Sequence, residues 1–244
     1  MTQDLLSSPL LLAAVFAIVV AAAIVQAGLG MGFGLTAAPL LALIDPQLVP
    51  APTLFLGMIT AVWGAWRERD AIVWSEVGLG VTGRLCGVFA ATFVLAALPN
   101  RDTFTLLFGL MIAAAVLLSV IGWKLVFNRT TLLAMSVISG LLGTITSVGA
   151  PPLALIYQDR SPAQARPTLS AFFAIGCILS LGGLYVSGWA GLHDLMLAAL
   201  MLPPMLLGTF IARQFGARFD KRFRPALLAV SAAAALILIL RGAL

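Results

Sequence analysis

Residues 28–39, GLGMGFGLTAAP, decide the fold of this chain. Four glycines stand at alternate positions between two apolar runs, and each weakens a helix by about 1 kcal/mol relative to alanine. At membrane depth, irregular backbone is tolerated only where it is buried in protein or lines a wet cavity. A second stretch of this kind, residues 146–153 (TSVGAPPL), follows in the second half. We name the stretches break 1 and break 2, and interpret them as the two halves of one binding site.

The composition is that of an integral membrane protein. Of 244 residues, 61% are hydrophobic and 9% are charged, whereas a soluble domain carries about 25% charged residues. The net charge of +5 reflects how the chain crosses the membrane rather than a nucleic-acid surface, because the basic residues lie between apolar runs. Cys86 and Cys177 lie inside apolar runs with no second ligand at zinc-like spacing, so we expect neither a disulfide nor a metal site.

Ten apolar segments follow one another along the chain. A membrane-spanning helix needs about 20 apolar residues to cross a core about 30 Å thick, and eight of the ten reach or approach that length. The other two, residues 33–44 and 150–158, are shorter, and each follows a break. The sequence therefore predicts an all-α integral membrane protein. The segments cover residues 9–27, 33–44, 50–66, 73–98, 103–123, 131–147, 150–158, 167–187, 192–216 and 222–240.

Short matches between the two halves of the chain predict an internal repeat. Residues 52–54 and 167–169 both read PTL, and Gly87 falls on Gly208 at the offset of 121 that also aligns residues 98–104 with 219–225. We place the repeats at residues 1–127 and 128–244. Each repeat then has about five segments, four long helices and one short broken or re-entrant helix, and the two repeats form one transport domain.

The basic residues predict how each repeat crosses the membrane. If each break turns the chain back, one side of the membrane receives ten Lys and Arg residues and the other side receives two. If each broken segment instead crosses the membrane once, the same twelve residues divide five against seven. Cytoplasmic loops carry the excess of Lys and Arg, so we favour the first scheme. It inverts one repeat relative to the other, as in many secondary transporters, and places both termini in the periplasm. The ten are Arg67, Arg69, Lys124, Arg129, Arg160, Arg166, Arg218, Lys221, Arg222 and Arg224, and the two are Arg101 and Arg241.

Both short helices begin with residues that suit a helix N-terminus. We expect Thr36 to cap the first helix, with Pro39 in its first turn, and Gly149 to cap the second, with Pro151 and Pro152 in its first turn. A helix N-terminus carries about half a positive charge and unpaired N–H donors, so it attracts anions. The two ends together predict a site for a small oxyanion.

The glycines of break 1 fit two interpretations. Without side chains they let a ligand approach the backbone, but their spacing of four residues also suits close packing between helices. We favour the first interpretation and assign the backbone of Gly30, Gly32 and Gly34 to anion binding.

Arg84 is the strongest single charge within an apolar segment. It stands near the middle of residues 73–98, where a cation is costly unless it faces the protein interior or a cavity. It either contacts the anion or pairs with Glu76, about two turns earlier. Polar side chains near the breaks and at the starts of the next helices bond either to a ligand or to the backbone. We include among the candidate binding residues Gln26, Thr53, Thr146, Ser147 and Thr168.

Three stretches resemble a known family. The PLL at residues 39–41, GAPPLAL at 149–155 and ARPTLSAFF at 165–173 are similar to the sulfite exporter TauE/SafE family of bacterial membrane proteins. The resemblance covers nearly the whole chain. It implies a multi-pass permease of the bacterial inner membrane that exports small sulfur-containing anions, such as sulfite or organosulfonates, without an organic cofactor. Break 1 departs from the family pattern, because Leu29, Met31 and Phe33 alternate with glycine where the family often has a denser glycine run.

The leading hypothesis is therefore a secondary transporter of small anions in the lipid bilayer, driven by a coupling ion (proton or sodium) or by the membrane potential. A passive anion channel of the same architecture is one alternative. An intramembrane enzyme is another, but the single histidine falls in a predicted loop, and no His-Glu-x-x-His or Gly-x-Ser-Gly pattern is present. We expect no nucleic-acid partner, and the sequence leaves the oligomeric state open.

Overall fold

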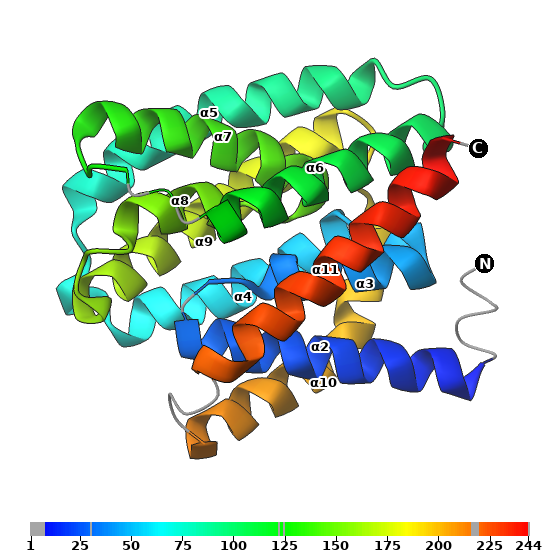
Figure 1. Ribbon diagram of the computed structural model, residues 1–244, viewed down its shortest axis with the longest axis horizontal. Coiled ribbons are helices and arrows are strands. Elements are labelled where there is room, and N and C mark those ends of the chain that lie inside the picture. The colour runs from blue at the N-terminus through cyan, green and yellow to red at the C-terminus, as the bar shows by residue number, and fades with distance from the viewer. Residues whose placement is uncertain (1–7, 30, 122, 124, 216–219, 244) are drawn as a thin grey trace.

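The computed structural model describes residues 8–29, 31–121, 123, 125–215 and 220–243 (Figure 1). All regular structure in these ranges is helical, so the predicted all-α fold is confirmed. The predicted apolar segments match the helices to within a few residues. The helices are α2 (Pro9–Leu29), α3 (Phe33–Ile44), α4 (Ala51–Arg67), α5 (Trp74–Ala96), α6 (Arg101–Ile121), α7 (Arg129–Thr146), α8 (Ala150–Tyr157), α9 (Pro162–Val186), α10 (Leu192–Phe215) and α11 (Asp220–Ala243), with short 3-10 helices η1 (Pro46–Leu48) and η2 (Arg69–Ala71).

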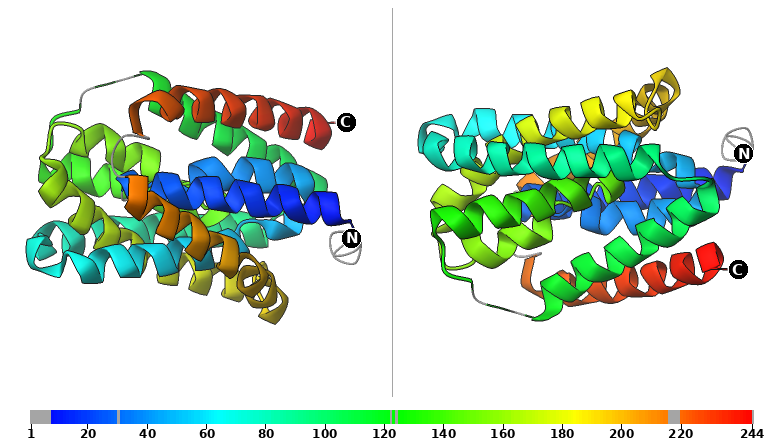
Figure 2. Two further views of the ribbon diagram at one scale, coloured as in Figure 1. Left: turned by 90° about the horizontal axis from the view of Figure 1, so that it is seen from below. Right: turned by 90° about the horizontal axis from the view of Figure 1, so that it is seen from above.

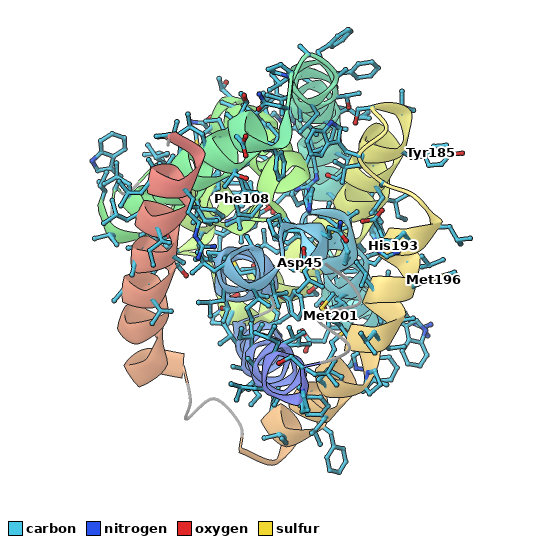
Figure 3. The ribbon with its side chains drawn as sticks, turned by 90° about the vertical axis from the view of Figure 1, so that its right-hand side faces the viewer. Asp45, Phe108, Tyr185, His193, Met196 and Met201 are labelled. Atoms are coloured by element: carbon cyan, nitrogen blue, oxygen red, sulfur yellow. The ribbon has the colours of Figure 1, made fainter. Side chains whose placement is uncertain are left out.

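The outer surface of the bundle is strongly apolar. Seven helices in the described part of the chain are long and apolar enough to cross a membrane. Figure 3 shows Phe108 and Met201 inside the bundle, each 1% exposed, and Tyr185 and Met196 on its surface, 73% and 60% exposed. Apolar side chains exposed all round a bundle are stable in lipid rather than in water. The chain is therefore a multi-pass membrane protein.

The two breaks reverse the direction of the chain. In Figure 1, α3 runs back alongside α2, and α8 packs against α7 in the same way. At about 1.5 Å per residue, the 12 residues of α3 span about 18 Å and the 8 residues of α8 about 12 Å. Neither helix is long enough to cross the bilayer alone. The predicted short helices that turn back at each break are therefore present.

One end of the bundle, which we name the basic end, gathers most of the described basic side chains. α4 ends there, and α5, α7 and α9 begin there, whereas α2 begins and α11 ends at the opposite end (Figure 1). Trp66, Trp74 and Trp123 are exposed at the basic end, which is where tryptophans collect at a membrane surface. The basic side chains described there are those of Arg67, Arg69, Arg129, Arg160 and Arg166.

Two helix crossings, each between a helix of the first half and a helix of the second, are closely alike. Figure 2 shows α2 beside α10 in one view and α5 beside α7 in the other. A Cβ on Gly87 of α5 would lie 2.0 Å from the Val137 carbonyl oxygen of α7, and a Cβ on Gly208 of α10 would lie 2.4 Å from the Val20 carbonyl oxygen of α2. Only glycine allows so close an approach of two helices. If the first and second halves of the chain changed places, the Gly87 crossing would fall on the Gly208 crossing, as expected for two related repeats. The two-repeat architecture itself stays a prediction.

Candidate functional site

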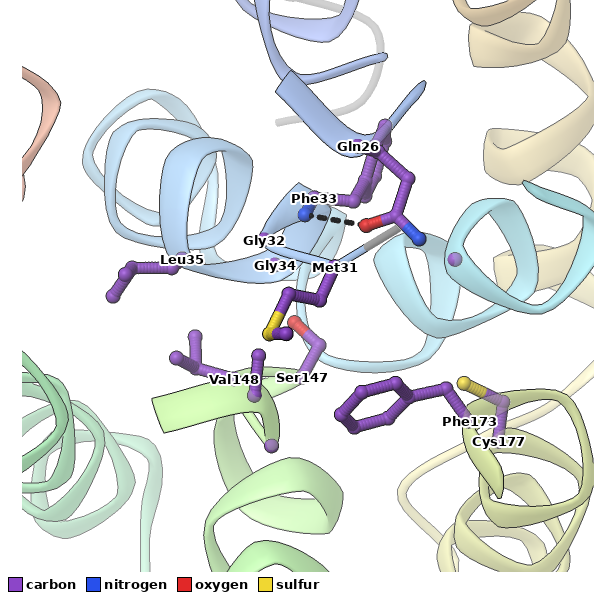
Figure 4. A pocket seen from close by; sticks show the side chains of 13 residues that line it. Gln26, Met31, Gly32, Phe33, Gly34, Leu35, Ser147, Val148, Phe173 and Cys177 are labelled. Atoms are coloured by element: carbon purple, nitrogen blue, oxygen red, sulfur yellow. Dashed lines mark hydrogen bonds between the residues drawn. The ribbon is translucent and has the colours of Figure 1, made fainter. Parts of the chain in front are cut away.

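Break 1 is shaped by a left-handed glycine and a glutamine from the preceding helix. Gly32 is the residue that precedes α3, and its φ of 110° is one that glycine adopts without strain. The buried side chain of Gln26 reaches forward from α2, and its Oε1 accepts the Phe33 N–H at 3.0 Å (Figure 4). Gln26 thus does for α3 what a capping side chain normally does.

The expected roles of Thr36 and Pro39 at the start of α3 are wrong. The helix begins at Phe33, so Thr36 lies a full turn inside it, and its hydroxyl donates to the Gly32 carbonyl at 3.1 Å. Pro39 lies in the helix interior rather than in the first turn. Proline lacks an N–H and so leaves the carbonyl four residues earlier without its helical partner. Here that carbonyl, of Leu35, accepts the buried Ser231 hydroxyl of α11 at 2.9 Å.

Break 2 has the N-terminus that the sequence predicts. Gly149 precedes α8, and Pro151 and Pro152 lie in the first turn, where a missing N–H costs little. Ser147 ends α7 with a φ of 59°, an uncommon conformation for a residue with a side chain. Thr146 holds the turn, because its hydroxyl donates to the Leu142 carbonyl at 2.6 Å and accepts the Val148 N–H at 3.1 Å.

The two breaks meet in space. Gly34 packs so closely on break 2 that a Cβ on it would lie 1.9 Å from the Ser147 carbonyl oxygen. Thr53 adds a link between α4 and break 2, because its hydroxyl oxygen lies 2.8 Å from the Pro50 carbonyl oxygen and 2.7 Å from the Ser147 hydroxyl oxygen. Backbone segments more than 110 positions apart in the sequence are therefore in direct contact.

A small cavity lies where the breaks meet (Figure 4). Its volume is about 40 Å³, and a water molecule needs about 10–15 Å³ by the same measure, so the cavity holds a few waters or a small anion. In Figure 4 the Met31 side chain extends from break 1 toward Ser147, and Phe173 and Cys177 stand on a neighbouring wall. The lining residues are Gln26, Met31, Gly32, Phe33, Gly34, Leu35, Gly57, Ser147, Val148, Gly149, Ala150, Phe173 and Cys177.

Arg84 lies behind one wall of this cavity rather than in it. The side chain is 1% exposed, and its Nη1 donates to the Ser139 hydroxyl at 3.0 Å. Ser139 in turn donates to the Gly149 carbonyl at 2.6 Å. Arg84 Nη2 donates to Ser180 at 3.3 Å, and Ser180 also accepts the Thr144 hydroxyl at 2.9 Å. Arg84 is therefore joined to break 2 through a single hydroxyl group.

The Arg84 guanidinium is packed tightly but carries no ion pair within the described residues. Its Nε has no hydrogen-bond partner there. The guanidinium carbon lies 5.3 Å from the Phe172 ring centre and 5.7 Å from that of Phe173, distances at which aromatic rings attract a cation. Gly176 makes room for it, since a Cβ there would lie 2.1 Å from Arg84 Nε. At the matching crossing, the residue three before Gly208 is Met205, which is also buried.

The possible pair between Arg84 and Glu76 is not formed. Glu76 lies at the basic end, where it accepts from Arg160 at 3.1 Å and from the Tyr157 hydroxyl at 2.8 Å. Burial is the larger cause and the hydrogen bond to Glu76 the second cause that raises the pKa of the Tyr157 hydroxyl. The hydroxyl therefore stays protonated and donates. The predicted pair with Glu76 is therefore wrong, and a role of Arg84 toward an anion stays a prediction.

Thr168 also lies at the basic end, away from the cavity. Its buried hydroxyl accepts the Val73 N–H at 3.0 Å, just before α5 begins. Nearby, Arg166 of α9 forms a two-pronged pair with Glu68 at the end of α4. These contacts tie the two halves together at the basic end.

The structure thus gathers part of the predicted set around one cavity. Gln26, Gly32, Gly34, Ser147 and Gly149 line it. Gly30 lies outside the described residues. The other predicted residues do not line it: Thr36, Pro39, Thr53, Arg84, Thr146, Pro151, Pro152 and Thr168.

Several residues of the site carried no signal in the sequence. Gly57, Phe173 and Cys177 are apolar or small residues that look like lipid-facing or core positions, whereas Met31 belongs to break 1. Ser139, Ser180 and Gly176, which hold Arg84, look like ordinary small residues of a membrane helix. Within the described part of the chain, no group of three or more His, Cys, Asp or Glu side chains is arranged to hold a metal ion.

Comparison with known proteins identifies the family of the chain. No curated protein and no solved structure matched the chain. The family model described as sulfite exporter TauE/SafE matches residues 15–238, from within α2 to within α11. That match covers nearly the whole chain and both breaks. The chain therefore belongs to the sulfite exporter TauE/SafE family of membrane transporters.

Proposed function

We propose that this protein is a secondary transporter that exports small sulfur-containing anions, such as sulfite or organosulfonates, and binds them in the cavity between the breaks. The observation that carries the proposal is the contact of Gly34 with Ser147, which brings break 1 and break 2, one from each half, to one cavity. Transporters built from inverted repeats commonly bind substrate where broken helices meet.

The local fields at the cavity favour an anion. α3 and α8 both begin at its wall, with Gly32 and Gly149 as the residues before them. The first turn of a helix leaves N–H groups without partners inside the helix, and its dipole attracts negative charge. In α3 the Phe33 N–H is bonded to Gln26, and the next two residues, Gly34 and Leu35, each carry an N–H. In the first turn of α8 only Ala150 carries an N–H, because Pro151 and Pro152 follow it, so α8 contributes mainly through its dipole. Two such ends at one small cavity suit an oxyanion better than a neutral solute.

Arg84 adds a permanent positive charge to this field. It touches the cavity wall at Gly149 and Phe173. Two opposite unit charges about 7 Å apart attract by about 2 kcal/mol when the effective dielectric constant is about 20. We assign to Arg84 the attraction of the anion through the wall of the cavity, without direct contact.

The orientation follows the positive-inside rule. We assign the basic end to the cytoplasm and both termini to the periplasmic side of a bacterial inner membrane. The similar crossings at Gly87 and Gly208 support two inverted repeats, which would rock about the cavity and expose it to each side in turn. A proton or sodium ion would provide the driving gradient.

Reconstituted vesicles test the proposal. Purified protein in proteoliposomes should move radiolabelled sulfite against its own gradient when a proton or sodium gradient is imposed. Movement that never exceeds equilibrium under any gradient would instead identify an anion channel. Absence of flux for sulfite and for organosulfonates alike would overturn the assignment of substrate.

A further inference from the structure

The cavity is tight at the breaks and open on the side of α4. A Cβ on Gly34 would overlap the Ser147 carbonyl, and a Cβ on Gly149 would lie 3.0 Å from the Ser139 carbonyl oxygen. Gly57 of α4 lines the same cavity, yet a Cβ on it would have no heavy atom of the described residues within 4 Å. The unfilled space is therefore beside Gly57.

The position of Gly57 relative to α9 follows from two contacts along the α4–α9 pair. Glu68 pairs with Arg166, and a Cβ on Gly64 would lie 2.9 Å from Ser170 Oγ. From the first contact to the second, the residue number falls by four along α4 and rises by four along α9, so the two helices are antiparallel. Two further turns along each helix bring Gly57 level with Cys177, which lines the cavity together with Phe173.

Apart from the Gln26 amide, which extends toward α4 in Figure 4, the surroundings of this space are apolar or weakly polar. The Phe173 ring and the Cys177 thiol stand on one wall, and the Met31 thioether crosses toward Ser147 (Figure 4). These groups suit a hydrocarbon substituent, whereas the positive dipole ends of α3 and α8 suit an oxyanion. Methionine is unbranched and flexible, so Met31 can adjust to substituents of different size.

On the basis of the proposed function, we propose that the space beside Gly57 is a subsite for the short alkyl group of an organic sulfonate, and that Gly57 and Met31 set the longest chain accepted. The sulfonate group lies against the starts of α3 and α8. The alkyl group lies between Gly57, Phe173 and Cys177. Sulfite lacks this group and leaves the subsite empty.

The variant Gly57→Ala tests the subsite, because it adds one methyl group to the open space and also raises helix propensity. The measurement is the ratio of ethanesulfonate to sulfite transport in proteoliposomes. We expect this ratio to fall about tenfold, the usual discrimination against one misplaced methyl group in an apolar pocket. Gly78→Ala and Gly182→Ala are matched controls, since a Cβ at either helical glycine also meets no described atom within 4 Å and neither lines the cavity. Both controls should keep the ratio of the unmodified protein.

The variant Met31→Ala gives the opposite test. It enlarges the cavity, so the ratio of propanesulfonate to ethanesulfonate transport should rise. A Gly57→Ala ratio equal to that of the controls, whether both fluxes fall together or neither changes, would overturn the subsite. If the unmodified protein transports neither sulfite nor any sulfonate, the proposed function is refuted instead. Failure of the subsite and failure of the proposed function therefore give different results.

Discussion

Gly34 and Ser147 are in backbone contact, although they belong to different halves of the chain. The space that a Cβ on Gly34 would need is filled by the Ser147 carbonyl, at 1.9 Å. Ser147 cannot easily retreat, because its left-handed backbone is held between Thr146 and the start of α8, and its hydroxyl is bonded to Thr53. This contact fixes the distance between the two helix starts at the cavity.

The variant Gly34→Ala should therefore force the breaks apart. Overpacking of this kind costs about 1–3 kcal/mol, so we expect a lower thermal unfolding temperature in detergent and about a tenfold loss of sulfite transport. Gly182→Ala is the control, because its Cβ meets open space. Unfolding and transport equal to those of Gly182→Ala would show that the contact of the breaks is not tight in the membrane.

The variant Arg84→Met separates charge from packing. Met205 occupies the matching position at the other crossing and is fully buried, so a methionine suits such a site. Arg84 carries no ion pair within the described residues. Replacing even a buried ion pair by apolar side chains of similar volume is often neutral or stabilising. We expect an unfolding temperature equal to or above that of the unmodified protein, together with a loss of sulfite affinity of about tenfold or more.

Arg84→Lys provides the matched comparison, because it keeps the charge but loses the two-sided hydrogen bonding to Ser139 and Ser180. It should retain more affinity than Arg84→Met. Equal sulfite affinity in Arg84→Met and the unmodified protein, measured by isothermal titration in detergent, would make Arg84 a structural residue only.

Hydropathy and the two interruptions, break 1 with its four glycines and break 2 with one glycine and two prolines, were sufficient to predict the helices and breaks to within a few residues. Long apolar runs leave few alternatives to helix in a bilayer, and glycine and proline mark the points where a helix must stop. Gly87 and Gly208, which the sequence matches as parts of a repeat, both lie at close helix crossings, and the repeat itself stays a prediction. These features are local in sequence, which is why they could be read directly.

The walls of the cavity could not be predicted in the same way. A cysteine or phenylalanine that lines a cavity has the same sequence pattern as one that faces lipid or the core, so Phe173 and Cys177 gave no signal. The start of α3 was misplaced for a related reason. Its cap comes from Gln26, seven residues earlier, whereas the local pattern pointed to Thr36.

Ser139 is expected to matter more than its neighbour Ser136. It links Arg84 Nη1 to the Gly149 carbonyl, so Ser139→Ala leaves two buried polar groups without partners, at a cost of about 1–3 kcal/mol. Ser136 stands one turn earlier on α7, is equally buried, and its hydroxyl has no partner among the described residues. Ser136→Ala should therefore be neutral or stabilising.

Thermal unfolding in detergent and sulfite affinity measure this difference. We expect Ser139→Ala to lower both, because break 2 and the guanidinium both lose their fixed positions. If Ser136→Ala and Ser139→Ala unfold at the same temperature, then Arg84 does not hold break 2 through Ser139.

The link between Ser231 and Leu35 can be tested through Pro39. Ser231→Ala removes the hydroxyl that bonds the Leu35 carbonyl, and proline at position 39 offers no N–H in its place. The single variant should lose about 1 kcal/mol of stability. When Pro39→Ala is added, the new N–H can bond Leu35 within the helix, so Ser231→Ala should then cost much less. A double-mutant cycle on unfolding free energies measures this coupling. Additive effects of the two substitutions would show that Ser231 does not compensate for Pro39, and that α11 holds α3 by apolar packing alone.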